Sequence, residues 1–328
     1  MLKKMIQAGM SIARINCSHG TVEQNADTMK RVQRVRAELN SDTWVMLDTK
    51  GPDIRIGAFE NGEVIVNEGQ SFTFYANPKD SNLLGTKDGV FVNYEKMPKK
   101  VSVGQELRLN DGMVFMSVTG VNETSVTARV TIGGLLKNRK SLAIPGCNLE
   151  LPFISKADED DLKMGVEVGV DCIAASFVGS AKDVLDMRAL LKKLGGSKIK
   201  IISKIESCYG IQNLDEIVKV SDGVMVARGD LGIEFNVEEL PVLQKVIIKK
   251  GRDAGIIVVT ATEMMESMIE KPRPTRAEVT DVANAVWDGT HYIMTSAETA
   301  SGKFPVQCLQ YMVRAASFAE SHKEYFRI

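Results

Sequence analysis

Two charged residues stand two positions apart at the end of a short apolar run. Lys204 and Glu206 follow Ile201 and Ile202, and alternation along a strand sends both charged side chains to the same side. If the strand belongs to a barrel, both side chains point into the mouth of that barrel, where active sites form. A rim ion pair of little consequence explains the same spacing equally well. The two residues alone leave both interpretations open.

A second charged segment follows the apolar run Gly223–Val226. It reads Ala227-Arg228-Gly229-Asp230-Leu231-Gly232. Its glycines allow the backbone to approach a phosphate closely, and the carboxylate of Asp230 is able to join Glu206 on a hard divalent cation. Taken alone, the segment is better explained as a turn with a solvated acid.

Two further polar segments follow apolar runs near the start of the chain. Asp48 and Thr49 come after Val45-Met46-Leu47, and Arg14 begins a segment that ends at Gly20. Their oxygen atoms are suited to cations, and the guanidinium of Arg14 is suited to two-point contact with a phosphate. Each segment is equally plausible as ordinary loop chemistry. His19, taken alone, is best explained as a strand-end histidine or a helix cap.

Alternating strands and helices must hold these polar and charged residues in place. From residue 151 onward, short apolar runs alternate with longer stretches of helical period, which is typical of repeated strand-helix units on a parallel sheet. The predicted strands are 172–177, 198–205, 223–227, 256–260 and 292–295. The predicted helices are 181–193, 240–254, 276–287 and 306–321. Five consecutive units favour an α/β barrel.

The amino-acid composition and pattern of the first half of the chain change at residue 53. Residues 11–16 and 44–48 predict two more barrel strands around a helix at 24–39. Residues 53–150 are instead rich in Val, Thr, Gly and Asn, with alternating runs and turn signals, which predicts short strands and tight turns. We therefore expect a discontinuous barrel domain, 1–52 and 151–328, with a small all-β lid domain inserted at 53–150.

The count of barrel strands falls one short of a closed barrel. Seven strands are predicted, whereas a TIM (β/α)8 barrel has eight. Residues 2–9 predict a helix ended by a glycine cap, with no strand before it. The sequence thus predicts a TIM-type barrel that lacks its first strand and has an open seam beside residues 14–16.

Bulk composition excludes several classes of partner. A net charge of −1 gives no basic surplus for nucleic acid or for an acidic membrane surface. The five cysteines are scattered and odd in number, which favours a reducing compartment. No run is long and apolar enough to span a bilayer. The expectation is a soluble, cytoplasmic protein.

In their order and spacing, these segments resemble one known family, the pyruvate kinases. The resemblance rests on residues 14–20, 48–55, 203–206 and 225–232, and above all on 265–286, which contains Lys-Pro-Arg-Pro-Thr-Arg-Ala-Glu. It implies transfer of phosphate from phosphoenolpyruvate to ADP, giving pyruvate and ATP. It also implies Mg²⁺ or Mn²⁺, K⁺ and a homo-oligomer, since the family is usually tetrameric.

The resemblance further implies a role for each matching residue. Glu206 and Asp230 would bind the divalent metal, and Asn16, Ser18, Asp48 and Thr49 would hold K⁺. The substrate would contact Arg14, Ser176, Lys204, Gly229, Asp230 and Thr262, with Lys204 neutralising charge in the transition state. Nucleotide would lie between the barrel and the inserted domain, at Asn16, Ser18, His19, Arg55 and Lys140. Thr262, Ser296 and Glu298 would organise the proton relay to the enolate.

Several positions depart from the family pattern. They are Gln24, Ala143, Gly179, Glu263 and Ala297, together with the run Ser207 to Gly210. Glu263 adds a carboxylate near a phosphate site, and Ala297 replaces a glycine that tolerates positive φ. The resemblance also ends at Ile328, before the family's C-terminal effector domain, so regulation by that route is expected to be lost.

These departures leave two alternatives to a working enzyme. One is a weak or inactive relative that acts as a binding or regulatory subunit, docking through the helix near 276–287. The other is a Mg²⁺ barrel that handles the same enolates in aldol or carboxyl chemistry. The inserted β domain and Lys140 argue for a nucleotide lid, and so against this second alternative.

Overall fold

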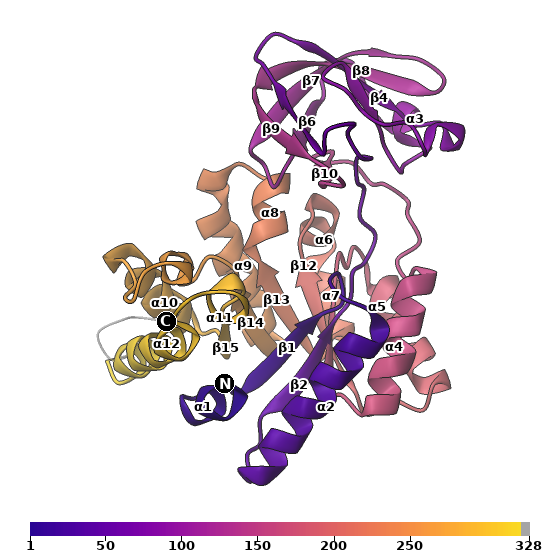
Figure 1. Cartoon of the computed structure of the whole chain (residues 1–328). Helices are drawn as coiled ribbons and strands as arrows, with labels where there is room; N and C mark the ends of the chain where they lie inside the picture. Colours follow the sequence, from indigo (N-terminus) through magenta and orange to yellow (C-terminus); the bar gives the residue numbers. More distant parts are fainter. Residues whose placement is uncertain (323–328) are drawn as a thin grey trace.

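A parallel sheet of seven strands forms the frame of the molecule (Figure 1). The computed structural model describes residues 1–322. In spatial order the strands are β1 (Ile12–Asn16), β2 (Trp44–Asp48), β11 (Cys172–Ala175), β12 (Lys200–Ile205), β13 (Gly223–Ala227), β14 (Ile257–Ala261) and β15 (Tyr292–Met294). Every pairing within this sheet is parallel. All carboxyl ends therefore lie at one edge, which Figure 1 shows facing the β-rich unit.

Helices cover the outer face of this curled sheet. The longer ones are α2 (Val22–Glu38), α4 (Lys156–Val168), α5 (Ala181–Lys193), α9 (Leu240–Asp253), α10 (Arg276–Asp288) and α12 (Pro305–Glu320). Shorter ones are α1 (Leu2–Gln7), α6 (Cys208–Gln212), α7 (Leu214–Val220), α8 (Arg228–Glu234) and α11 (Ala297–Ala300). Capping boxes at Thr21, Ser155, Ser180 and Thr275 fix where four of them begin. No helix within residues 1–322 is long and apolar enough to cross a membrane.

Alternation along the strands separates two apolar cores. Leu47, Ile173 and Ile201 point outward and pack with the covering helices. Their strand neighbours Met46, Ala174 and Ile202 point inward and fill the centre of the barrel. Because the side-chain period of a strand is two, each inward residue predicts the direction of the residue two positions further on.

The barrel sheet is open between its first and last strands. Within residues 1–322, β1 pairs only with β2, and β15 pairs only with β14. The predicted seven-stranded TIM-type barrel with a seam beside Arg14 is therefore confirmed.

A β-rich unit lies between β2 and α4 in the chain. One sheet has the order β10 (Leu142–Ala143), β6 (Glu106–Leu109), β7 (Val114–Val121), β8 (Ser125–Ile132), β4 (Ser71–Tyr75) and β5 (Gly89–Phe91), and β3 (Glu63–Val66) pairs with β9 (Gly134–Lys137). A short helix, α3 (Met97–Lys100), packs beside β8. Phe72, Phe74 and Leu107 are fully buried in a core of its own. The inserted all-β unit is confirmed, and its boundaries at 53 and 150 stay a prediction.

Most predicted elements agree with the structure within two residues. The difference that matters most is in the strand predicted at 172–177, because β11 ends two residues earlier, at Ala175, and Phe177 has a φ of +56°. This left-handed turn aims the Phe177 amide back at the site. Helix α4 and the short helices α6 to α8 were not among the predicted segments.

Candidate active site

Strand alternation brings four predicted site residues together inside the mouth of the barrel. Arg14, Asp48, Ser176 and Lys204 each lie two positions beyond an inward-facing residue, namely Ile12, Met46, Ala174 and Ile202. Their strands are neighbours, with Arg14 opposite Met46 and Ala174 opposite Asp48. The backbone period alone therefore delivers two cations and a carboxylate to one place.

Lys204 is the centre of this cluster. Its Nζ donates to Ser176 Oγ at 2.7 Å and to Asp48 Oδ1 at 3.2 Å, and it lies 2.8 Å from Glu206 Oε1. The lysine is 8% exposed, whereas Asp48 and Glu206 are fully buried. Arg14 forms an ion pair with the other oxygen of Asp48. This is an ordered, nearly dry network of two cations and two carboxylates.

The network shifts the ionisation of its members in opposite directions. Burial alone would lower the pKa of Lys204, but the carboxylates of Asp48 and Glu206 outweigh burial and raise that pKa well above its usual range. Burial likewise opposes ionisation of Asp48, but Lys204 and Arg14 overcome it and lower its pKa. Lys204 is therefore a permanent cation and Asp48 a permanent anion near neutral pH.

Glu206 and Asp230 form a second, different pair. Burial is the main reason why the pKa of each carboxyl group is raised, and mutual repulsion raises that of Glu206 further. Glu206 Oε2 accepts a 2.6 Å hydrogen bond from the Phe177 amide. Glu206 Oε1 has Lys204 as an ionic neighbour, but its geometry gives it no hydrogen-bond partner among the described residues.

A buried carboxylate oxygen that lacks a well-aligned hydrogen bond among the described residues, beside the half-buried carboxyl group of Asp230, fits a divalent cation, because a hard metal stabilises both charges at once. Within residues 1–322, no group of three or more His, Cys, Asp or Glu side chains is arranged to hold a metal. Glu206 and Asp230 would therefore be joined by oxygen ligands from water or substrate, as Mg²⁺ commonly accepts. The donor set thus fits the predicted Mg²⁺ or Mn²⁺.

Gly229 and Thr262 meet at the same edge of the barrel. The Gly229 amide donates to Thr262 Oγ1 at 2.9 Å. Thr262 and Glu263 both have positive φ, +68° and +54°, so the turn after β14 is strained. The predicted substrate residues Gly229, Asp230 and Thr262 are thereby adjacent.

Arg228 is a residue whose importance the sequence analysis missed. Its guanidinium forms an ion pair with Asp281 of α10 at 2.7 Å and donates to the Thr262 carbonyl. Arg228, the first residue of α8, therefore links the strained turn at Thr262 to α10. The pattern Arg-Gly-Asp gave no signal for this, because Asp281 lies 53 positions away.

The four predicted K⁺ ligands lie at the ends of β1 and β2. Asn16 is opposite Asp48 in the sheet, and its Oδ1 accepts from the Ser18 amide at 3.1 Å. Thr49 Oγ1 accepts from the Ser176 amide at 3.1 Å. Asp48 is already the counter-ion of Arg14 and Lys204. Their role with K⁺ stays a prediction.

The residues predicted to bind nucleotide, on and beside the β-rich unit, do not form one cluster as the residues around Lys204 do. Arg55 is paired with Asp53 at 2.6 Å and donates to the Arg139 carbonyl, and Lys140 is paired with Asp111 at 2.7 Å. His19 is exposed on the loop after β1. None of these partners belongs to the Lys204 network.

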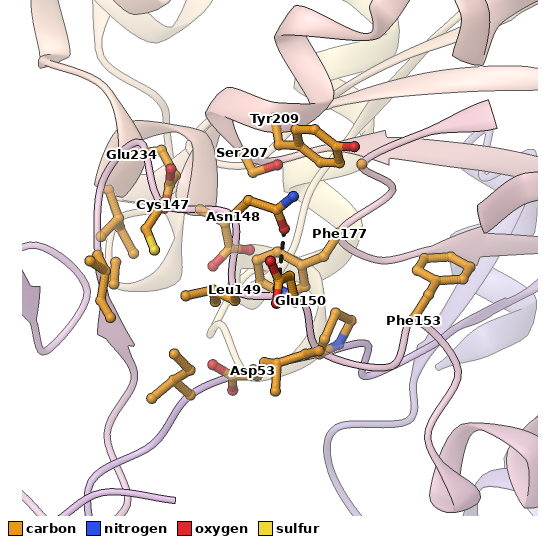
Figure 2. Close-up of a pocket in the computed structure, with 18 of the residues that line it drawn as sticks. Asp53, Cys147, Asn148, Leu149, Glu150, Phe153, Phe177, Ser207, Tyr209 and Glu234 are labelled. Carbon is orange, nitrogen blue, oxygen red and sulfur yellow. Dashed lines mark hydrogen bonds between the residues drawn. The ribbon is translucent and has the colours of Figure 1, made fainter. Parts of the chain in front are cut away.

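A cavity of about 300 Å³ lies between the β-rich unit and the barrel (Figure 2). Its lining includes carboxyl groups at Asp53, Asp230 and Glu234, with Phe177 and Tyr209 beside them. It contains no lysine or arginine, and His19, Arg55 and Lys140 are not among its lining residues. The cavity alone therefore does not match the phosphates of a nucleotide, although its place agrees with the predicted cleft.

Ser296 and Glu298 occupy a separate corner near α11. Glu298 is fully buried, and its two carboxylate oxygens accept from the Met265 amide at 3.1 Å and the Ser296 amide at 2.7 Å. Glu298 thus joins two loops. Within residues 1–322, no hydrogen bond or ion pair joins Glu298 to the Lys204 network, so the proton relay stays a prediction.

The departures from the family pattern have modest local consequences. Glu263 is exposed, so its added charge is hydrated. Ala297 is not among the residues with positive φ, so a glycine is not required there, contrary to the expectation from sequence. Ala143 lies in β10 and lines the cavity.

An open α/β barrel with a lysine, a metal-type carboxylate pair and a strained turn at its strand ends defines a class: barrel proteins equipped to bind a metal and a phosphorylated anion. Residues 1–309 match the family model described as pyruvate kinase, barrel domain. The chain belongs to the pyruvate kinase family.

Relatives in that family are similar over nearly the whole chain. Pyruvate kinases of Clostridium perfringens and Bacillus licheniformis are each 43% identical to it, over 99% and 98% of this chain. Pyruvate kinase of Leishmania mexicana is 44% identical over 98%. The chain spans 68%, 55% and 64% of the lengths of these three relatives.

Proposed function

We propose that this protein transfers phosphate from phosphoenolpyruvate to ADP. The observation that carries the proposal is the Lys204 ammonium, held between Asp48, Ser176 and Glu206 at the carboxyl ends of the barrel strands. Phosphoryl transfer asks the protein chiefly for positioning and for cations around the phosphoryl oxygens. A charged lysine that is buried and hydrogen-bonded beside a metal-type carboxylate pair meets both needs.

The residues of the site divide this work among them. Lys204 and Arg14 would face the phosphoryl oxygens, and Asp48 keeps both cations in place. Glu206 and Asp230 would hold Mg²⁺ or Mn²⁺, which when bound supplies further positive charge to the phosphate. The Gly229 amide and Thr262 would orient the substrate. Once phosphate leaves, the enolate takes a proton, and Thr262, Ser296 and Glu298 remain the proposed relay.

The remaining partners are proposed from the family relationship. K⁺ would bind at Asn16, Ser18, Asp48 and Thr49. ADP would bind in the cleft under the β-rich unit, with His19, Arg55 and Lys140 at its phosphates. A cytoplasmic homo-oligomer is the expected setting. No observation favours the binding-subunit or aldol alternatives.

A coupled assay tests the proposal. Pyruvate formation is measured with phosphoenolpyruvate, ADP, Mg²⁺ and K⁺ for the natural chain, for Lys204→Ala and for Lys245→Ala, which removes an exposed lysine on α9 that is paired with Asp288. We expect Lys204→Ala to lower kcat at least about 100-fold, while Lys245→Ala leaves it unchanged. Absence of turnover from folded natural chain would refute the proposal and favour a binding role.

A further inference from the structure

Arg108 of β6 reaches out of the β-rich unit and binds the end of α8. Its Nη1 donates to the carbonyl oxygens of Ile233 at 3.0 Å and Phe235 at 2.7 Å, and its Nη2 donates to Asn236 Oδ1 at 3.2 Å. The residue is 8% exposed although it carries a charge. Three hydrogen bonds from one buried guanidinium therefore join the two units across the cleft.

The inner side of the same guanidinium is fixed within the β-rich unit. Nε donates to Glu106 Oε1 at 2.7 Å, and the guanidinium carbon lies 5.3 Å from the centre of the Phe115 ring. A planar fork held on one edge presents its other edge in a fixed direction. A lysine, with a single flexible ammonium, cannot reproduce this geometry.

The partner of Arg108 is the helix that carries the metal carboxylate. Helix α8 is only seven residues long, with Gly229 and Asp230 in its first turn and Ile233 in its last. The carbonyl groups at the end of a helix have no partner within the helix, and Arg108 binds that of Ile233 in the last turn and that of Phe235 just after the helix. Figure 1 shows α8 on the side of the barrel that faces the β-rich unit.

Other links between α8 and the β-rich unit are weaker. The Gly146 amide donates to Glu234 Oε2 at 3.4 Å, which is near the limit for a hydrogen bond. Arg108 therefore makes shorter hydrogen bonds to the end of α8 than Gly146 does.

We infer that Arg108 is a positioning residue for the metal pair: by clamping the end of α8, it holds Asp230 against Glu206 while the β-rich unit covers the cleft. The inference rests on the proposed function, because that function assigns the metal to Glu206 and Asp230. Its test measures metal affinity, which does not require turnover.

The test compares Mn²⁺ affinity, read by electron paramagnetic resonance of free Mn²⁺, among variants of the full chain. Arg108→Met keeps the length of the side chain and removes all its hydrogen bonds, and we expect Kd to rise about tenfold, as for other groups that support metal ligands. Arg108→Lys keeps the charge and should recover part of the affinity. Arg129→Met, which removes an exposed arginine from β8 of the same sheet, should leave Kd unchanged.

Hydrogen exchange supplies the second readout. Amides of residues 228–236 should exchange faster in Arg108→Met, while those of β12 do not change. If Arg108→Met fails to fold, Asn236→Ala removes one acceptor only and should raise Kd about threefold, a smaller share of the effect expected of a supporting group.

Each outcome decides the inference. Unchanged Kd in folded Arg108→Met, or equal losses in Arg108→Met and Arg129→Met, would overturn it, as would a natural chain that binds no Mn²⁺. A natural chain that binds Mn²⁺ in this Arg108-dependent way but shows no turnover would support the inference and refute the proposed function.

Discussion

Two regions of this molecule hold lysines beside carboxylates, and they do so in opposite ways. Lys204 is buried among Asp48, Glu206 and Ser176 at the ends of barrel strands. Lys140 lies on the β-rich unit, where it pairs with the exposed carboxylate of Asp111. In the first region the backbone fixes the charges before any ligand arrives, whereas in the second a more exposed pair has to exchange partners to bind one.

The difference shows where a rigid scaffold matters. Charges fixed in a dry site act on a ligand without reorganisation, so they suit the reacting phosphate. Exposed charges are screened by water and salt, and they suit the reversible capture of a second substrate. The following predictions test this contrast.

The largest effect is expected on stability at Lys204. Lys204→Met leaves Asp48 and Glu206 buried with one cation fewer, so we expect the free energy of unfolding to fall by about 3 kcal/mol. Lys140→Met should cost less than about 1 kcal/mol, because its pair is exposed. Urea unfolding followed by circular dichroism measures both. Equal shifts would show that the two regions do not differ as described.

The region that the backbone fixes is also the one that the sequence predicted well. Arg14, Asp48 and Lys204 lie within barrel strands and Glu206 directly follows one, and the period of two residues determines which way they point. The seven strands and their open seam were predicted by the same pattern. Local periodicity is sufficient to predict which side chains meet where a parallel sheet gathers the carboxyl ends of its strands at one edge.

The features of the site that the sequence did not predict depend on contacts between distant segments, which periodicity does not encode. The left-handed turn at Phe177, the clamp from Arg108 and the pair between Arg228 and Asp281 each join elements far apart in the chain. The buried partners of Glu298 likewise come from two backbone amides. No residue type in the sequence signals that these groups meet.

The second prediction concerns pH at the metal pair. Burial raises the pKa of both Glu206 and Asp230, so a proton competes with the metal. Below the pKa of the pair, Mn²⁺ affinity should fall about tenfold per pH unit for each proton displaced. Titrations at pH 8 and pH 6 measure this. Glu234→Gln, which alters a half-buried carboxyl group at the end of α8, should keep the same pH dependence, and a flat profile in the natural chain would contradict the prediction.

Stability without metal should vary in the opposite sense. The unfolded chain releases these protons near the ordinary values of 4.5 and 3.8, whereas the folded state retains them to higher pH. Stability contributed by the pair is therefore full below the unfolded values and is lost as pH rises through the folded ones. Added Mg²⁺ should raise the melting temperature more at pH 8 than at pH 6.

The smallest effect is expected at the exposed pair, and it tests the proposed exchange of partners. If Lys140 leaves Asp111 to bind ADP, Asp111→Asn removes a competitor and should lower the KM for ADP about twofold to threefold, since an exposed pair is worth well under about 1 kcal/mol. Lys140→Met should raise this KM without changing kcat. Steady-state kinetics at low and high salt measure both, and screening should shrink the difference at high salt. A rise in KM for Asp111→Asn would show that the pair orients Lys140 toward the nucleotide instead of withholding it.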